Sequence, residues 1–119
     1  RFLCGDDFYI WSGNDDQVVP MMALGAKGVI SVASNIVPEV MAEMTHLCLD
    51  NDFAAASQLQ IRYMDLIDAL FTEVNPIPIK AAMNLLGMDA GSLRLPLCDI
   101  SDKNLDTLRR AMERAGLLK

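Results

Sequence analysis

The hydrophobic pattern of the first third of the chain predicts two short strands with a helix between them. Residues 8–11 (FYIW) form a β-favouring run that ends at Ser12-Gly13. Residues 28–33 (GVISVA) form a second run, in which apolar residues do not alternate with polar ones, as in a strand covered on both faces. Residues 16–24 have helical spacing and end before Gly25. A strand–helix–strand unit this short predicts two parallel neighbours joined by a right-handed crossover.

From residue 37 onward the pattern has helical spacing. Four helices are predicted, over residues 37–49, 53–72, 78–86 and 102–115. Asp52 and Ser101 stand at N-cap positions, whereas residues 75–80 (NPIPIK) are expected to be extended, since each proline disfavours helix in the residue before it. The apolar positions expected to face the core are Val40, Met41, Met44, Leu47, Cys48, Phe53, Leu59, Tyr63, Leu66, Ile67, Leu70, Phe71, Leu105, Leu108 and Met112.

The predicted element order is βαβα followed by three more helices, an α/β arrangement that is mostly helical. It divides the chain into a strand–helix segment, 1–50, and a helical extension, 51–119. Two parallel strands do not complete a sheet, because their outer edges would be exposed. Apolar residues make up 52% of the chain, and mean hydropathy is +0.24, which is high for 119 residues. We therefore expect further chain or a partner subunit to cover this surface, and we expect the separate chain to self-associate.

Charge and cysteine usage narrow the class of protein. A net charge of −6 argues against a nucleic-acid partner, because phosphate contacts need clustered Lys and Arg. No apolar run approaches the roughly 18 residues that span a bilayer, and Asp6-Asp7 interrupts any signal-peptide pattern. The three cysteines, Cys4, Cys48 and Cys98, lack motif spacing, which is typical of reduced thiols. The sequence thus predicts a cytoplasmic protein without nucleic-acid or membrane partners.

Candidate catalytic groups are few. His46 is the only histidine, and no GxGxxG, P-loop or Ser/His/Asp pattern is present, so we expect no metal and no cofactor. Lys27 and Lys80 are the lysines to consider for a Schiff base. Lys27 precedes the second predicted strand, so it lies at the opposite end of that strand from the expected site. Lys80 lies at the start of a predicted helix, after the proline-rich segment. Neither is assigned a covalent role, so no catalytic residue is predicted in this chain.

Binding residues are expected where the two predicted strands end, since the carboxyl ends of parallel strands form the site in βα architectures. Gly13 lets backbone approach a ligand closely, and the following helix start attracts a carboxylate. A turn followed by a helix cap also explains the sequence Ser-Gly-Asn-Asp at 12–15. At Ile30 the side chain is expected to pack in the core, so only its backbone is a candidate for binding.

Three stretches carry a resemblance that covers nearly the whole chain. The strings SGNDDQVVPMMALGAKGVISVASNIVP, EVNPIPIKAAMNLLG and LRLPLCDIS closely resemble the C-terminal part of the dihydrodipicolinate synthase family. The resemblance implies the end of a (β/α)8 TIM barrel followed by three extra helices, in a cytoplasmic homotetramer. It also implies a lyase of lysine and diaminopimelate biosynthesis, which condenses pyruvate with L-aspartate 4-semialdehyde through a Schiff base.

The resemblance also assigns roles to residues. The Schiff-base lysine and a proton-relaying tyrosine of the family would lie upstream of this sequence. The pyruvate-pocket wall carries over to Ile30, through its backbone, to Gly13, and to Asn14, where many relatives have Asp. Two alternatives stay open: a catalytically inactive, self-associating helical fragment, and the equivalent part of another pyruvate aldolase such as N-acetylneuraminate lyase.

Overall fold

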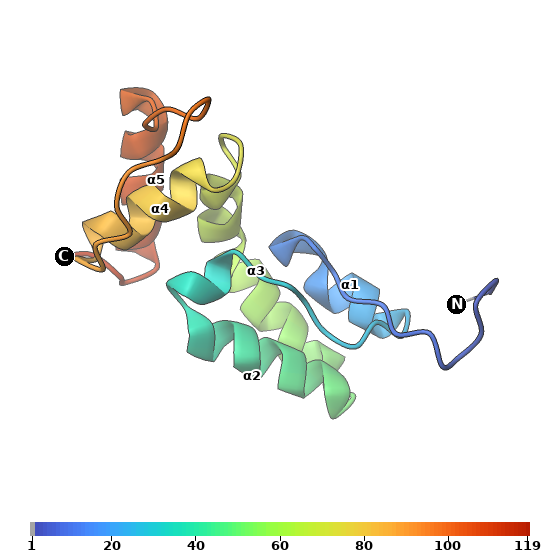
Figure 1. Ribbon diagram of the computed structural model, residues 1–119. Helices are drawn as coiled ribbons and strands as arrows, with labels where there is room; N and C mark the ends of the chain where they lie inside the picture. Colours follow the sequence, from blue (N-terminus) through green and yellow to red (C-terminus); the bar gives the residue numbers. More distant parts are fainter. Residues whose placement is uncertain (1) are drawn as a thin grey trace.

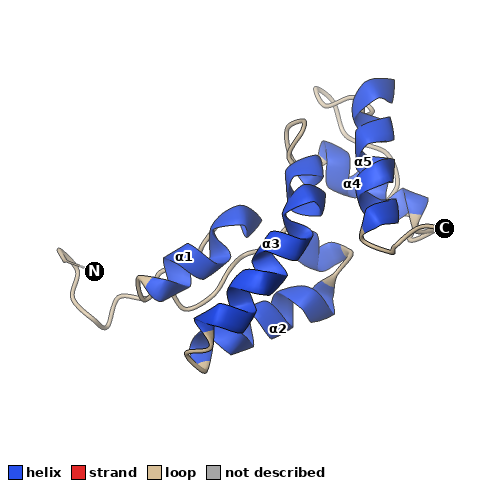
Figure 2. Cartoon of the chain, turned by 180° about the vertical axis from the view of Figure 1, so that it is seen from behind, coloured by secondary structure: helices blue, strands red, loops and turns tan. Residues whose placement is uncertain are grey.

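Every regular element is a helix in the computed structural model, which describes residues 2–119 (Figures 1 and 2). The elements in chain order are the 3-10 turn η1 (Asp15–Gln17), α1 (Val18–Ala23), the 3-10 turn η2 (Ala33–Asn35), α2 (Pro38–Leu49), α3 (Phe53–Leu70), α4 (Ile77–Leu85) and α5 (Asp102–Arg114). In Figure 1 the N-terminal segment extends away from the helices, and α4 and α5 lie at the opposite end of the molecule. The molecule is elongated, with principal dimensions of 44 × 32 × 21 Å.

The predicted strands 8–11 and 28–33 are wrong as elements, since neither forms a strand. The segments do run side by side in parallel, through one isolated bridge between Ser12 and Val29. The Ser12 N–H donates to the Gly28 carbonyl at 2.9 Å, and the Ile30 N–H donates to the Ser12 carbonyl at 2.9 Å. A strand needs a hydrogen-bonded neighbour along its length, and the described residues give each segment only the other. The parallel relation is confirmed, but strand formation is not.

The expected burial of residues 28–33 is found only at the two ends, where Gly28 and Ala33 are buried. Ile30 is 76% exposed, and Val29 and Val32 are only partly buried. The extended conformation ends at Val32, whose φ of −80° and ψ of −46° are helical, because η2 begins at Ala33. Nothing in residues 2–119 covers the outer face of this segment, so the apolar run stays accessible.

The helix predictions hold to within a few residues, apart from the segment NPIPIK. Helix α1 ends before Gly25, which adopts a left-handed φ of 96° as expected of a C-terminal glycine. The Asp52 side chain caps α3 by accepting a hydrogen bond from the Ala55 N–H at 3.0 Å. The segment 75–80 is not extended, because α4 already begins at Ile77. Pro78 lies in its first turn, where a missing N–H costs little.

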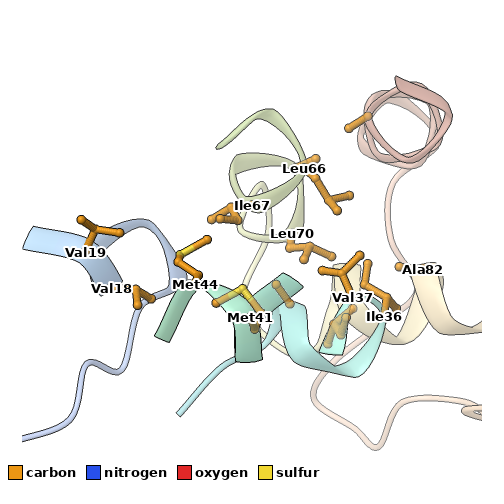
Figure 3. Packing of buried hydrophobic residues seen from close by; sticks show 14 of the residues in the cluster. Val18, Val19, Ile36, Val37, Met41, Met44, Leu66, Ile67, Leu70 and Ala82 are labelled. Atoms are coloured by element: carbon orange, nitrogen blue, oxygen red, sulfur yellow. The ribbon is translucent and has the colours of Figure 1, made fainter. Parts of the chain in front are cut away.

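The core joins all five helices, α1 to α5 (Figure 3). Fully buried side chains at its centre are Val18, Met44, Leu66, Ile67, Leu70, Leu108 and Met112. Of the predicted core positions, Phe71 is wrong: it is 39% exposed, because α3 ends at Leu70 and Phe71 is its C-cap. Phe53, Leu59 and Tyr63 are only partly buried, at the edge of the cluster. The same cluster spans both sides of residue 50, so the two parts of the chain pack as one body.

The start of α5 is held by a carboxylate from the segment after α3. Ser101 is the N-cap residue, as predicted, but its side chain makes no capping bond. Glu73 Oε1 instead accepts hydrogen bonds from the Ser101 N–H at 3.0 Å, the Ser101 hydroxyl at 2.7 Å and Asn104 Nδ2 at 2.8 Å. The bonds from Asn104 and Ser101 hold the pKa of the Glu73 carboxyl below its ordinary value.

We expect Glu73→Gln to lower the thermal unfolding midpoint at neutral pH and to have little effect in acid. The pKa of Glu73 is lowered from 4.5 in the folded state, so its carboxylate stabilises the fold above that value. The contribution is lost as the pH falls through the lowered folded pKa. Unfolding midpoints of parent and variant, measured from about pH 7 to about pH 3, should therefore converge in acid. Glu113→Gln, which removes an exposed carboxylate on α5, is the control. An equal difference between parent and Glu73→Gln at every pH would contradict the assignment.

Candidate functional site

A pocket of about 550 Å³ opens beside the parallel bridge. One wall follows the paired segments and η2, and the other comes from the first two turns of α4 and the residues before it. The lining residues are Gly13, Ile30, Ser31, Val32, Asn35, Asn75, Pro76, Ile79, Lys80 and Met83. The pocket thus lies where both paired segments end, as expected for a site of parallel βα architecture.

Gly13 and Ile30 are brought together in this pocket. Each directly follows a residue of the bridge, Ser12 or Val29. A Cβ on Gly13 would meet no atom within 4 Å, so this part of the wall is open backbone. Two of the three predicted binding residues therefore share one pocket.

Asn14 is placed elsewhere. It lines a separate pocket of about 160 Å³, together with Asp16, Ile67, Asp68 and Phe71. The Ser12 hydroxyl donates to the Asn14 carbonyl at 2.7 Å and accepts from the Asn14 N–H at 3.1 Å, which folds the loop back on itself. The chain turns between Gly13 and Asn14, so consecutive residues line different cavities.

Asp15 has a role that the sequence did not indicate. It was predicted to belong to a loop and N-cap cluster, but its side chain is completely buried. Its Oδ2 accepts hydrogen bonds from the Val32 N–H at 2.9 Å and the Ala33 N–H at 3.1 Å. Among the described residues its other oxygen, Oδ1, has no hydrogen-bond partner. The carboxylate therefore joins the loop after the first segment to the turn after the second.

Gln60 connects this loop to α3. Its Nε2 donates to the Asp15 carbonyl at 2.8 Å, and its Oε1 accepts from the Val19 N–H at 3.3 Å. Gln60 is only 5% exposed, a polar side chain on the buried face of a helix. In the sequence, Gln60 stands three residues before Tyr63 and seven before Ile67, both predicted to face the core, and this spacing is the signal that could have found it.

The two candidate lysines are in different surroundings. Lys27 is exposed, with its Nζ 6.0 Å from the centre of the Tyr9 ring. Lys80 lines the pocket, which the sequence did not predict, and its Nζ donates to the Ser92 carbonyl at 2.6 Å. The Lys80 ammonium is therefore directed to a backbone carbonyl of the 88–100 loop.

Other chemistry is sparse in residues 2–119. No group of three or more His, Cys, Asp or Glu side chains is arranged to hold a metal ion there. Cys4, Cys48 and Cys98 are free thiols, and burial raises the pKa of Cys48. Within the same residues, no helix is both long enough and apolar enough to cross a bilayer.

Comparison with known proteins identifies the family. Residues 1–115 match the dihydrodipicolinate synthetase family. The chain belongs to this family. The resemblance stated from the three sequence stretches is thereby confirmed.

Individual members of the dihydrodipicolinate synthetase family agree in sequence and fold. The 4-hydroxy-tetrahydrodipicolinate synthase 1 of Clostridium acetobutylicum is 50% identical over 119 residues, which are 100% of this chain and 41% of the relative. The crystal structure of the Aquifex aeolicus dihydrodipicolinate synthase superposes with a TM-score of 0.92 at 43% identity. That match covers 95% of this chain and 39% of the other. The enzyme of Acinetobacter baumannii, crystallised in complex with pyruvate, gives a TM-score of 0.89 at 35% identity over 93% of this chain and 38% of the other. The chain thus spans about 40% of the length of the family members that it matches.

Proposed function

We propose that this chain is the C-terminal part of a 4-hydroxy-tetrahydrodipicolinate synthase, a lyase that condenses pyruvate with L-aspartate 4-semialdehyde through a Schiff base. The observation that carries the proposal is the shared pocket of Gly13 and Ile30, beside a parallel backbone pair, in a member of this family. The pyruvate bound to the Acinetobacter baumannii relative supports an α-keto acid as ligand. The names of the matched relatives favour this activity over that of an N-acetylneuraminate lyase.

In this proposal the paired segments are the seventh and eighth strands of a (β/α)8 barrel. Residues 1–50 belong to the barrel, and residues 51–119 form the helical extension. Large apolar side chains that would contact the rest of the barrel are exposed here: Phe2, Leu3, Phe8, Tyr9, Trp11, Leu24 and Ile30. Through the same side chains we expect the separate chain to self-associate. The assembled enzyme is proposed to be a cytoplasmic homotetramer, although one solved relative is described as a monomeric variant.

The chain's own part in the reaction is to shape the pyruvate pocket. Gly13 and the Ile30 backbone form one wall, whereas Asn14, the third predicted residue, lines the separate pocket beside α3 and not this wall. The imine-forming lysine and the proton-relaying tyrosine lie outside these 119 residues in this proposal, so the separate chain has no activity. Losing a nucleophile costs orders of magnitude in rate, which pocket walls alone do not restore.

A hybrid enzyme tests the proposal. In the hybrid synthase, this chain replaces the matched 119 residues of the Clostridium acetobutylicum enzyme. We expect the hybrid synthase to condense pyruvate with aspartate semialdehyde and to support growth of bacteria that lack the synthase without added diaminopimelate. The separate chain should do neither.

Two controls make the result decisive. The unmodified Clostridium acetobutylicum enzyme sets the reference rate, and the same enzyme without its last segment should be inactive. A hybrid synthase that unfolds at the same temperature as the reference enzyme, yet forms no product, would refute the proposed function. Activity of that hybrid with N-acetylneuraminate in place of aspartate semialdehyde would favour the other aldolase.

A further inference from the structure

The pocket wall is fixed at two places along the chain. The first is the bridge, where Ser12 pairs with Val29. The second is the Asp15 carboxylate, which accepts hydrogen bonds from the Val32 and Ala33 N–H groups at 2.9 and 3.1 Å. Gly13 lies between the two fixed points on one segment, and Ile30 lies between them on the other.

We propose that Asp15 is a positioning residue, whose carboxylate holds the Gly13–Ile30 wall in the geometry that binds the α-keto acid substrate. This inference rests on the proposed function. Asp15 itself does not line the pocket and touches no reacting atom. It acts through the turn at Val32–Ala33, which begins two residues after Ile30.

The surroundings of Asp15 favour this role over a helix cap. The carboxylate reaches a backbone turn 17 and 18 residues away, rather than the N–H groups of its own helix. The Asp15 carbonyl accepts a hydrogen bond from the buried Gln60 amide at 2.8 Å, so its backbone is anchored to α3. The turn at Val32 is thus tied through Asp15 to the most extensively packed helix of the core.

A buried carboxylate oxygen without a donor is costly, and only its partners offset that cost. Oδ1 is such an oxygen within residues 2–119, while Oδ2 carries both hydrogen bonds. We call the Asp15 carboxylate and the Val32 and Ala33 N–H groups that it binds the clamp. The clamp therefore needs one correctly placed acceptor oxygen and no second one. Asparagine has the same shape and one such oxygen, so it should replace aspartate, whereas alanine should not.

The test compares Asp15→Ala and Asp15→Asn in the hybrid synthase. For Asp15→Ala we expect the KM for pyruvate to rise about tenfold to a hundredfold, because a displacement of the order of 1 Å at a binding wall has effects of that size. The fall in kcat should be smaller than the rise in KM. Asp15→Asn should restore a KM close to that of the parent.

A matched variant separates positioning from stability. Leu108 is completely buried on α5 and does not line the pocket. Leu108→Ala should lower the unfolding temperature and the fraction of active enzyme but leave the KM for pyruvate unchanged. The inference is overturned if Asp15→Ala behaves in the same way as Leu108→Ala.

Amide hydrogen exchange gives a readout that does not depend on activity. The Val32 and Ala33 amides should exchange slowly in the parent and in Asp15→Asn, and faster in Asp15→Ala. The Ser34 amide, which donates to the Ser31 hydroxyl at 2.8 Å, is the reference within the same turn. If Asp15→Ala does not fold, two other results still overturn the inference. One is rapid exchange of the Val32 and Ala33 amides in the parent. The other is a KM for pyruvate that Asp15→Asn raises about tenfold or more, the size of effect expected for Asp15→Ala.

The two proposals fail in different ways. An inactive but folded parent hybrid in which Asp15 still protects Val32 and Ala33 would refute the proposed function and leave the clamp in place. An active parent hybrid whose KM for pyruvate does not respond to Asp15→Ala would refute the positioning role alone.

Discussion

Borohydride reduction in the presence of pyruvate is expected to leave the separate chain unmodified and to label the hybrid synthase fully. Borohydride traps an imine as a stable secondary amine, and an imine forms only where a neutral amine meets the carbonyl carbon. Lys27 is exposed beside Tyr9, and the Lys80 Nζ donates to the Ser92 carbonyl at 2.6 Å. Lys27 lies outside the pocket that holds Gly13 and Ile30, and the Lys80 Nζ is bonded to a carbonyl, so neither amine is placed to attack a keto acid in that pocket. Intact mass spectrometry of both proteins measures the difference.

Lys80 needs a specific control because it lines the pocket with Gly13 and Ile30. Lys80→Arg in the hybrid synthase should leave the pyruvate label in place, on a peptide that comes from the Clostridium acetobutylicum part. Lys27→Arg is the matched exposed change. A label on the separate chain, or loss of the label in Lys80→Arg, would show that this chain supplies the Schiff-base lysine.

The helices were predictable because their information is local. Three- and four-residue spacing placed α2 and α3 to within two residues, and Asp52 caps α3 as its sequence position indicated. The strands were not predictable, because strand formation depends on neighbours that residues 2–119 do not supply. Of the predicted strand pair, the structure shows only the parallel relation between the two segments, which follows from the short crossover.

The side-chain contacts show where local reasoning stops. Ser101 occupies an N-cap position and Asp15 is the first residue of η1, yet neither side chain bonds an N–H group of its own helix. Asp15 binds a turn more than 15 residues away. The Ser101 hydroxyl donates to Glu73, which lies in the segment after α3. Both residue types commonly bond nearby backbone, but here each bonds a group far along the chain, because the packing of the elements decides which partner is available.

The candidate site was predictable in part for the same reason. The rule that parallel segments form a site at their carboxyl ends pointed to the loop that holds Gly13, and the family resemblance added Ile30. The structure places both residues in one pocket. The opposite wall, with Asn75 and Lys80, comes from the packing of α4, which no local pattern specifies. Asn14 was predicted to line the same pocket as Gly13 but does not. The backbone turns between the two residues, so that Asn14 lines a different pocket.

The most direct measurement is a crystal structure of the hybrid synthase after reduction with pyruvate and borohydride. The account predicts that residues 10–12 and 28–30 are adjacent parallel strands, each with a further barrel strand on its other side. It also predicts that Gly13 and the Ile30 backbone contact the trapped three-carbon group. A structure with these segments unpaired or antiparallel, or with the trapped group away from both residues, would contradict the account.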